Sequence, residues 1–213
     1  HPEIAEAEDV QPNANIALVD GASPTERFPA AHCYCPSLEK PYEVLFDMMD
    51  EIIEVFRPNS YVHMGHDEVY YMGLCDKCKD VPHDVLFARD VNRIYNHLKD
   101  LGYRTMMWSD MIQPVTKYET PGAIKMIPKD ILCLDFIWYF HLDKDIEDNL
   151  LEKGFKVAFG NLYSSHFPRY ESRIVKDGIV GGQISAWVPT NERELQKEGK
   201  LYDFFMTAQM LWS

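Results

Sequence analysis

Short apolar runs recur along the chain and are separated by longer stretches in which apolar residues return every three or four positions. Runs of this length that end at turn-forming residues predict buried strands, and the wider spacing predicts amphipathic helices. The predicted strands are Tyr61–Met64, Arg104–Trp108, Ile131–Trp138, Lys156–Phe159 and Gly178–Trp187. A chain with this alternation belongs to the α/β class.

Two long helices are predicted on either side of the first strand. One begins near Ser37 and is stopped by Arg57-Pro58-Asn59-Ser60, and the other is capped by Asp84 and ended by Gly102. The apolar face of the first helix consists of Val44, Leu45, Met48, Met49, Ile52, Ile53 and Phe56. The inward face of the second consists of Val85, Leu86, Ala88, Val91, Ile94, Tyr95 and Leu98. Further helices are predicted over Asp143–Lys153, Arg169–Lys176 and Lys200–Trp212.

The chain of 213 residues is long enough for one domain. Residues 1–38 are rich in proline and form an irregular lead-in, whereas residues 39–213 form successive βα units. Strands joined by helices predict a parallel sheet with right-handed crossovers. Because a closed (β/α)8 barrel usually needs about 250 residues, the chain would form only part of such a barrel. An open, doubly wound sheet fits the same local pattern.

The stretch Tyr61 to Val69 carries the strongest chemical signal, because an apolar run ends in Gly65 and then in two adjacent acids, Asp67 and Glu68. Consecutive residues of a regular strand point to opposite faces, so a bend is needed to aim both acids at one ligand. Gly65 is well placed to supply it. Two carboxylates held this close are expected to raise one pKa toward the range of a general acid.

The net charge of −13 argues against nucleic acid or an anionic membrane as a partner, since both attract clustered Lys and Arg. A neutral sugar fits this charge, and aromatic residues, at 13% of the chain, suit sugar rings as well as a large core. No apolar run is long enough to predict a membrane span. The start, His1-Pro2-Glu3-Ile4, does not resemble a signal peptide, and the cellular compartment stays open.

The five cysteines, Cys33, Cys35, Cys75, Cys78 and Cys133, do not suggest a disulfide framework. Cys75 and Cys78 have the Cys-x-x-Cys spacing of half a structural zinc site, and Cys33 with Cys35 could supply the other half. Thiols without metal, or a redox-labile pair, fit the spacing as well. We therefore predict no metal in the catalytic chemistry and leave structural zinc open.

Several motifs together resemble glycoside hydrolase family 20, the β-N-acetylhexosaminidases. The segment His63-x-Gly65-x-Asp67-Glu68-Val69 is similar to the family's fourth-strand signature. The other similar segments are Cys35-Pro36-Ser37, Trp108-Ser109-Asp110 (fifth strand), Asn161-Leu162-Tyr163 (seventh strand) and Gly182 to Trp187 (eighth strand). The resemblance runs in order from about Cys35 to the C-terminus, and it implies that the five predicted strands are the fourth to eighth of a (β/α)8 TIM-type barrel.

The resemblance implies an exo-acting glycoside hydrolase that removes terminal N-acetyl-hexosamine from oligosaccharides or glycoconjugates by a substrate-assisted, retaining mechanism, without a cofactor. It implies that Glu68 is the general acid and base. Asp67 would stay ionised and orient the substrate's acetamido group, and Tyr163 would donate its hydroxyl to the acetamido oxygen.

The same resemblance implies a substrate pocket at the C-terminal ends of the strands, where barrel enzymes build their sites. Trp108, Trp138 and Trp187 would form its walls. Asp110 and Glu192 are candidates for binding sugar hydroxyls, although Asp110 also fits a helix cap, and Glu192 follows the last Trp at a longer spacing than the family uses. His63 fits the strand-end network or the core. The family's first-strand Arg and third-strand His have no counterpart.

Two further functions are compatible with parts of the sequence. A non-catalytic, carbohydrate-binding relic of the fold would have no use for the proton-transferring residues Asp67, Glu68 and Tyr163. A metal-dependent hydrolase could use His63 and His66 together with the two acids as ligands. The two histidines would point to opposite faces of a regular strand, however, and the tryptophans would be unexplained.

Overall fold

In the computed structural model, the residues described are 33–69, 72–115, 119–135, 145–163, 166–186 and 188–212. The chain divides into two compact units, which are described separately here. The first unit comprises His1–Val62, Glu68–Arg104 and Thr116–Pro128, and the second comprises His63–Asp67, Thr105–Val115 and Lys129–Ser213. Along the sequence, one point of division falls between Asp67 and Glu68.

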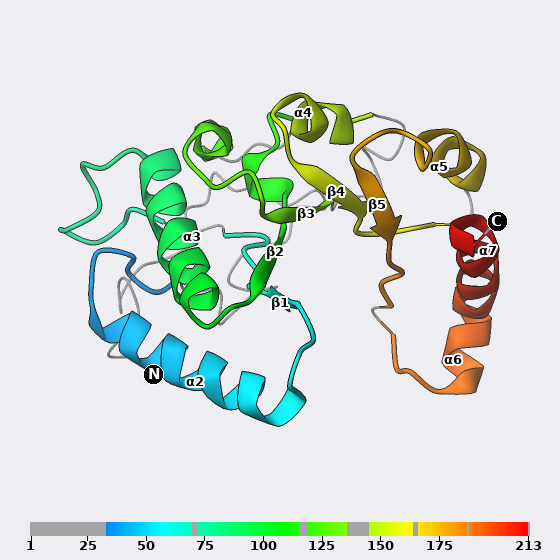
Figure 1. The fold of residues 1–213 in the computed structure, drawn as a ribbon, viewed down its shortest axis with the longest axis horizontal. Coiled ribbons are helices and arrows are strands. Elements are labelled where there is room, and N and C mark those ends of the chain that lie inside the picture. The colour runs from blue at the N-terminus through cyan, green and yellow to red at the C-terminus, as the bar shows by residue number, and fades with distance from the viewer. Residues whose placement is uncertain are drawn as a thin grey trace. The chain divides into compact units, whose positions relative to one another are not determined.

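One five-stranded sheet contains all the strands of the described residues (Figure 1). The strands are β1 (Tyr61–His63), β2 (Arg104–Trp108), β3 (Leu132–Asp135), β4 (Lys156–Phe159) and β5 (Ile179–Gly182). They lie in the order β1-β2-β3-β4-β5, and the pairs from β2 to β5 are parallel. A doubly wound sheet reverses its strand order at a switch point, whereas a barrel keeps sequential order. The observed order therefore favours part of an α/β barrel over the open sheet.

The register of the sheet aligns a row of buried side chains. Met107 pairs with Cys133, and Cys133 pairs with Val157. All three side chains are fully buried. The next pair, Val157 with Ile179, is followed by a register shift between Val157 and Ala158. This row is one layer of the buried core. It supports the C-terminal strand ends, where the predicted site residues lie.

In the first unit, α2 (Lys40–Phe56) begins and ends close to its predicted limits. It stops at Arg57, whose backbone is left-handed with φ of 47° and whose N–H donates to the Ile53 carbonyl oxygen. The predicted inward face is only partly correct, because several of its apolar side chains are more than half exposed. These are Met48, Ile52 and Phe56, together with the neighbouring Val55.

Helix α3 (His83–Asp100) buries its predicted face, with the exception of Val85, which is only half-buried. Two features differ from the prediction. Pro82, and not Asp84, is the N-cap, and the Asp84 carboxylate accepts a hydrogen bond from the Val85 N–H inside the first turn. The short 3-10 helix η3 (Pro121–Lys125), which the sequence did not predict, lies against α3.

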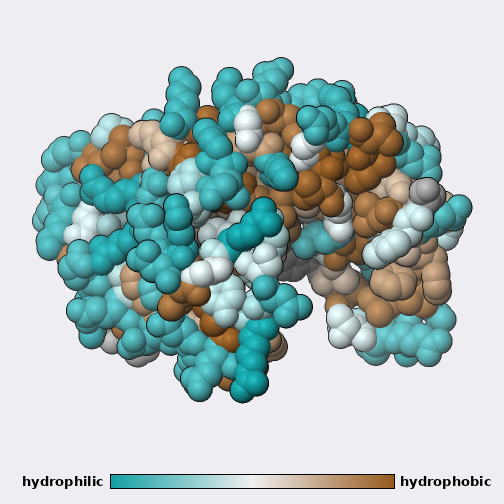
Figure 2. Space-filling view, in the orientation of Figure 1, coloured by the Kyte–Doolittle hydropathy of each residue, from teal (hydrophilic) through white to brown (hydrophobic). Residues whose placement is uncertain are grey.

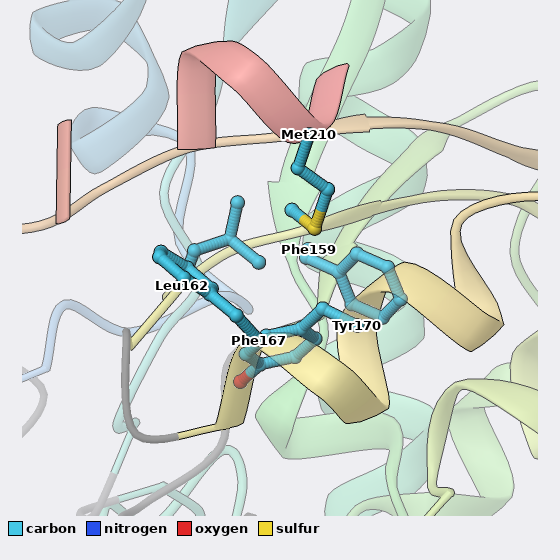
Figure 3. Packing of buried hydrophobic residues seen from close by; sticks show 5 residues of the cluster. All are labelled: Phe159, Leu162, Phe167, Tyr170 and Met210. Carbon is cyan, nitrogen blue, oxygen red and sulfur yellow. The ribbon is translucent and has the colours of Figure 1, made fainter. Parts of the chain in front are cut away.

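In the second unit, α4 (Glu147–Glu152) and α5 (Phe167–Arg173) are shorter than predicted, whereas α7 (Lys200–Trp212) has its predicted limits. The short helices η2 (Asp110–Ile112) and α6 (Glu192–Lys197) were not predicted. Figure 3 shows the core cluster that joins α5 and α7 to β4, made of Phe159, Leu162, Phe167, Tyr170 and Met210. Because Met210 comes from α7 and Phe167 and Tyr170 from α5, this cluster holds both helices to the residues at the end of β4.

Apolar side chains also reach the surface of α7. Phe204, Phe205 and Trp212 are each at least 60% exposed, and Figure 2 shows tan residues over this helix. Among the described residues, no helix combines the length and apolar character needed to cross a membrane.

Candidate active site

The segment that follows β1 bends sharply and carries the acid pair. Gly65, His66 and Glu68 all have left-handed backbones, with φ of 77°, 74° and 51°. Residues other than glycine rarely adopt this conformation, which costs about 1 kcal/mol or more and clusters at functional sites. The bend predicted at Gly65 is confirmed, and left-handed backbone occurs again at His66 and Glu68, where the sequence did not predict it. The alternation of a regular strand therefore does not apply to Asp67 and Glu68.

Hydrogen bonds hold the start of the bend against β2. The Met64 N–H donates to the Met106 carbonyl oxygen at 2.9 Å, and the Trp108 N–H donates to the Gly65 carbonyl oxygen at 3.0 Å. Within the segment, the Gly65 N–H donates to His63 Nδ1 at 3.0 Å. The acids thus begin two residues after a point that is fixed to the C-terminal end of β2.

The His63 ring is held by its surroundings in a neutral form. Its Nδ1 accepts the bond from Gly65, and its ring meets Trp108 edge to face with centroids 5.2 Å apart. Burial lowers the pKa of His63 despite the opposing charge of Asp67. The sequence left open whether His63 belongs to the strand-end network or to the core. It does both, because it accepts the hydrogen bond from Gly65 in the bend and packs against Trp108.

The two acids differ in exposure. Asp67 is exposed and Glu68 is half-buried. A half-buried carboxyl group is the better placed of the two for holding a proton, because partial desolvation disfavours its charged form. The raised pKa expected for one member of the pair stays a prediction.

Trp108 lies at the C-terminal end of β2 and is half-buried. A side chain at Gly160 would begin 2.6 Å from the Trp108 ring and 2.8 Å from the Asp135 carbonyl oxygen. Only glycine fits there, so the indole reaches across β3 to the end of β4. The Asn-x-Tyr segment starts at the next residue, Asn161. Trp108 and the Tyr163 segment are thereby brought to the same strand ends.

Tyr163 is half-buried just after β4. Lys200 Nζ lies 5.0 Å from the centre of its ring. Burial and then the charge of Asp203 raise the pKa of Tyr163. Its hydroxyl group is therefore protonated at neutral pH and is available as a hydrogen-bond donor.

Asp110 is fully buried at the first position of η2. The alternative role of helix cap is wrong, because Ser109 occupies the N-cap. Sequence analysis missed a neighbouring acid, Asp135, at the C-terminal end of β3. Burial first, and then Glu147, raise the pKa of Asp135 to about 8, although Gln113 donates to its carboxylate at 3.4 Å. The one signal for it in the sequence is an acid within the otherwise apolar run Ile131–Trp138.

Of the remaining predicted site residues, the structure describes only Glu192, which is not brought into this group. Glu192 is exposed on the first turn of α6, where its carboxylate accepts a hydrogen bond from Gln196. Trp138 and Trp187 lie outside the described residues.

The arrangement of possible metal ligands bears on the metal-dependent alternative. Within the described part of the chain, the only group of three or more His, Cys, Asp or Glu side chains with converging ligand atoms is Cys35, Cys75 and Cys78. His63 and His66 do not converge with the acids in this way, and the Nδ1 atoms of both rings are engaged by the bend itself. The geometry gives no support to a metal site at the acid pair.

Comparison with known proteins agrees with this architecture. The family model for the glycosyl hydrolase family 20 catalytic domain matches residues 19–202. The β-N-acetylhexosaminidase from Bacteroides fragilis is 16% identical with a TM-score of 0.56, and the match covers 87% of this chain and 49% of that one. Dispersin B is 17% identical with a TM-score of 0.49, over 84% of this chain and 60% of that one. No curated protein sequence matches.

The likeness to the Bacteroides fragilis structure supports the fold, and the chain spans about half the length of that protein. The family model covers most of the chain, including the bend, Trp108, Tyr163 and the last predicted strand. The chain belongs to glycosyl hydrolase family 20.

Proposed function

We propose that the protein is an exo-β-N-acetylhexosaminidase that hydrolyses terminal N-acetyl-hexosamine by a substrate-assisted, retaining mechanism. One observation carries the proposal. Soon after β1, the backbone is left-handed at Gly65, His66 and Glu68, and this bend contains the adjacent acids Asp67 and Glu68. Membership of family 20 supplies the reaction class. The described strands would then be the fourth to eighth of the barrel.

Glu68 is the proposed general acid and base. It protonates the departing glycosidic oxygen while the 2-acetamido oxygen of the substrate attacks the anomeric carbon, and it then removes a proton from the incoming water. Its partial burial suits a group that must be neutral before bond cleavage.

Asp67 is the proposed electrostatic partner of the acetamido group. A carboxylate that stays ionised accepts the acetamido N–H and offsets the positive charge that develops on the cyclic intermediate. Asp67 is exposed to solvent.

Tyr163 is the second residue proposed to hydrogen-bond the acetamido group. Its protonated hydroxyl donates to the carbonyl oxygen of the acetamido group and holds that oxygen for in-line attack. Trp108 supplies an apolar wall beside it, backed by Gly160. The pocket would also include Trp138, Trp187 and Asp110, and Glu192 would contribute only after leaving its surface contact with Gln196.

The proposal is tested by hydrolysis of N-acetyl-glucosaminides by the wild type and by Glu68→Gln and Asp67→Asn. Each variant should lose about a hundredfold or more in kcat/KM. Glu68→Gln should lose more on a substrate with a poor leaving group, such as a methyl glycoside, than on a 4-nitrophenyl glycoside, since the latter needs little protonation.

Glu51→Gln is the matched control, because Glu51 is exposed on α2. It should behave as the wild type. Unchanged rates in both Glu68→Gln and Asp67→Asn would end the assignment. A wild type that binds N-acetylglucosamine and hydrolyses none of these glycosides would favour the carbohydrate-binding relic.

A further inference from the structure

Three cysteine side chains of the first unit converge, and the cluster includes neither Asp67 nor Glu68. Cys35 Sγ lies 3.4 Å from Cys75 Sγ and 3.5 Å from Cys78 Sγ, and the three sulfurs all lie within 4.8 Å of one another. Cys35 and Cys78 are fully buried. The cluster joins residues separated by 40 and 43 positions in the sequence. Neither the sheet nor the proposed hydrolysis uses it.

The backbone around the cluster is folded into turns that present the sulfurs. The N–H groups of Cys78 and Lys79 both donate to the Cys75 carbonyl oxygen at 2.9 Å, which closes the Cys-x-x-Cys turn. The Leu38 N–H donates to the Cys35 carbonyl oxygen in the turn before α2. These turns bring the sulfur atoms of Cys35, Cys75 and Cys78 together.

The sulfur spacing distinguishes between a disulfide and a metal site. A disulfide brings two sulfurs to about 2.05 Å and leaves the third outside. Tetrahedral zinc with Zn–S bonds of about 2.3 Å holds its sulfur ligands about 3.8 Å apart. The observed 3.4 and 3.5 Å need only a few tenths of an ångström of expansion to reach that value. All five cysteines are among the described residues, and none forms a disulfide bond.

We propose that Cys35, Cys75 and Cys78 bind one zinc ion, which acts as a structural clamp between the start of α2 and the loop that precedes α3. Three thiolates supply three of the four tetrahedral positions. The fourth position is open to Cys33, two residues from Cys35, or to water. The site would stabilise the first unit by holding two segments that lack a regular strand or helix of their own.

The test is the zinc content and cobalt spectrum of the purified protein. After equilibration with zinc and removal of loosely bound metal, the wild type should retain about one zinc per chain. Replacement of zinc by Co2+ should give the thiolate-to-cobalt charge-transfer band and the intense visible bands of tetrahedral sulfur coordination. The double variant Cys75→Ser/Cys78→Ser should lose both the zinc and these bands.

Cys133→Ser is the matched control, because Cys133 is fully buried in β3 of the second unit. It should retain zinc and the cobalt spectrum. If the double variant fails to fold, the wild type alone decides. A strong chelator should lower its melting temperature, and added zinc should restore it. A wild type that retains no zinc, or a cobalt complex without thiolate bands, would overturn the proposal whether or not the protein hydrolyses glycosides.

Discussion

Gly65 shows how one residue positions the proposed chemistry. Its φ of 77° is left-handed, and a Cβ there would meet no atom within 4 Å. Gly65→Ala therefore changes only the backbone preference. It should cost about 1 kcal/mol of unfolding free energy and also reduce hydrolysis, because the bend that aims Asp67 and Glu68 would relax. Chemical denaturation and kcat/KM measure the two effects.

Gly154→Ala separates stability from function. Gly154 has φ of 86° and equally open surroundings, but it follows α4. It should cost a similar free energy of unfolding and leave hydrolysis unchanged. Equal loss of activity in both variants would mean that the bend has no special role.

Tyr163→Phe removes the proposed hydroxyl donor and little else. The rate of hydrolysis should fall by about a hundredfold, as when a single donor to a developing charge is lost, while the melting temperature should change little. Tyr202→Phe, at an exposed position of α7, is the control and should be silent in both measurements. A fall in melting temperature that accounts for the whole loss of activity would reduce Tyr163 to a packing residue.

Asp135 should make stability depend on pH. Its pKa is about 8 in the folded protein against an ordinary value of 3.8, so the unfolded chain releases the proton first. Its contribution is fully present below pH 3.8 and is lost as pH rises through 8. Asp135→Asn, which mimics the neutral carboxyl, should therefore gain stability relative to the wild type as pH rises. Melting curves of the wild type and of Asp135→Asn measure this across the pH range. A difference in melting temperature that does not change with pH would contradict the raised pKa of Asp135.

At the scale of single residues, the sequence predicted the acid pair and the glycine because they interrupt an apolar run. It did not predict the left-handed His66 and Glu68, since residues other than glycine seldom adopt that conformation and no local pattern marks where they do. Asp135 was also missed. The burial of an acid depends on what packs above it, and that is set by residues far away in the sequence, here Gln113 and Glu147.

At the scale of elements, the limits of β2 and β4 agree with the apolar runs, because each of these strands lies between two others in the sheet. The last strand was predicted too long, since β5 ends at Gly182 and not at Trp187. The shorter helices α4 and α5 begin and end away from the predictions, and α6 was not predicted. Short helices depend on tertiary packing more than on their own sequence.

Asp90 of α3 illustrates an element held by a contact that periodicity cannot reveal. Its buried carboxylate accepts hydrogen bonds from Tyr34 at 2.8 Å and from Tyr42 at 2.6 Å, which tie the lead-in and α2 to α3. Asp90→Asn should lower the free energy of unfolding by about 2 kcal/mol, because bonds to a charged acceptor are lost. Asp100→Asn, at the exposed end of the same helix, is the control for denaturation and should be neutral. Equal stability of the two variants would contradict this role.

At the scale of the whole molecule, the sequential order of the strands agrees with part of an α/β barrel. Alternation of strands and helices predicted a parallel sheet, but it could not choose between a barrel and an open sheet. That choice depends on which strands are neighbours, and strand neighbours are set by long-range pairing. The chain spans about half of its Bacteroides fragilis relative, so the activity of the whole protein stays a proposal.

The most direct measurement is the ratio of kcat/KM for two 4-nitrophenyl glycosides, one of N-acetylglucosamine and one of glucose, which lacks the acetamido group. If the acetamido oxygen is the nucleophile held by Asp67 and Tyr163, the glucoside should react at least about a hundredfold more slowly, because no protein group replaces the nucleophile. Equal turnover of the two substrates would contradict substrate-assisted hydrolysis.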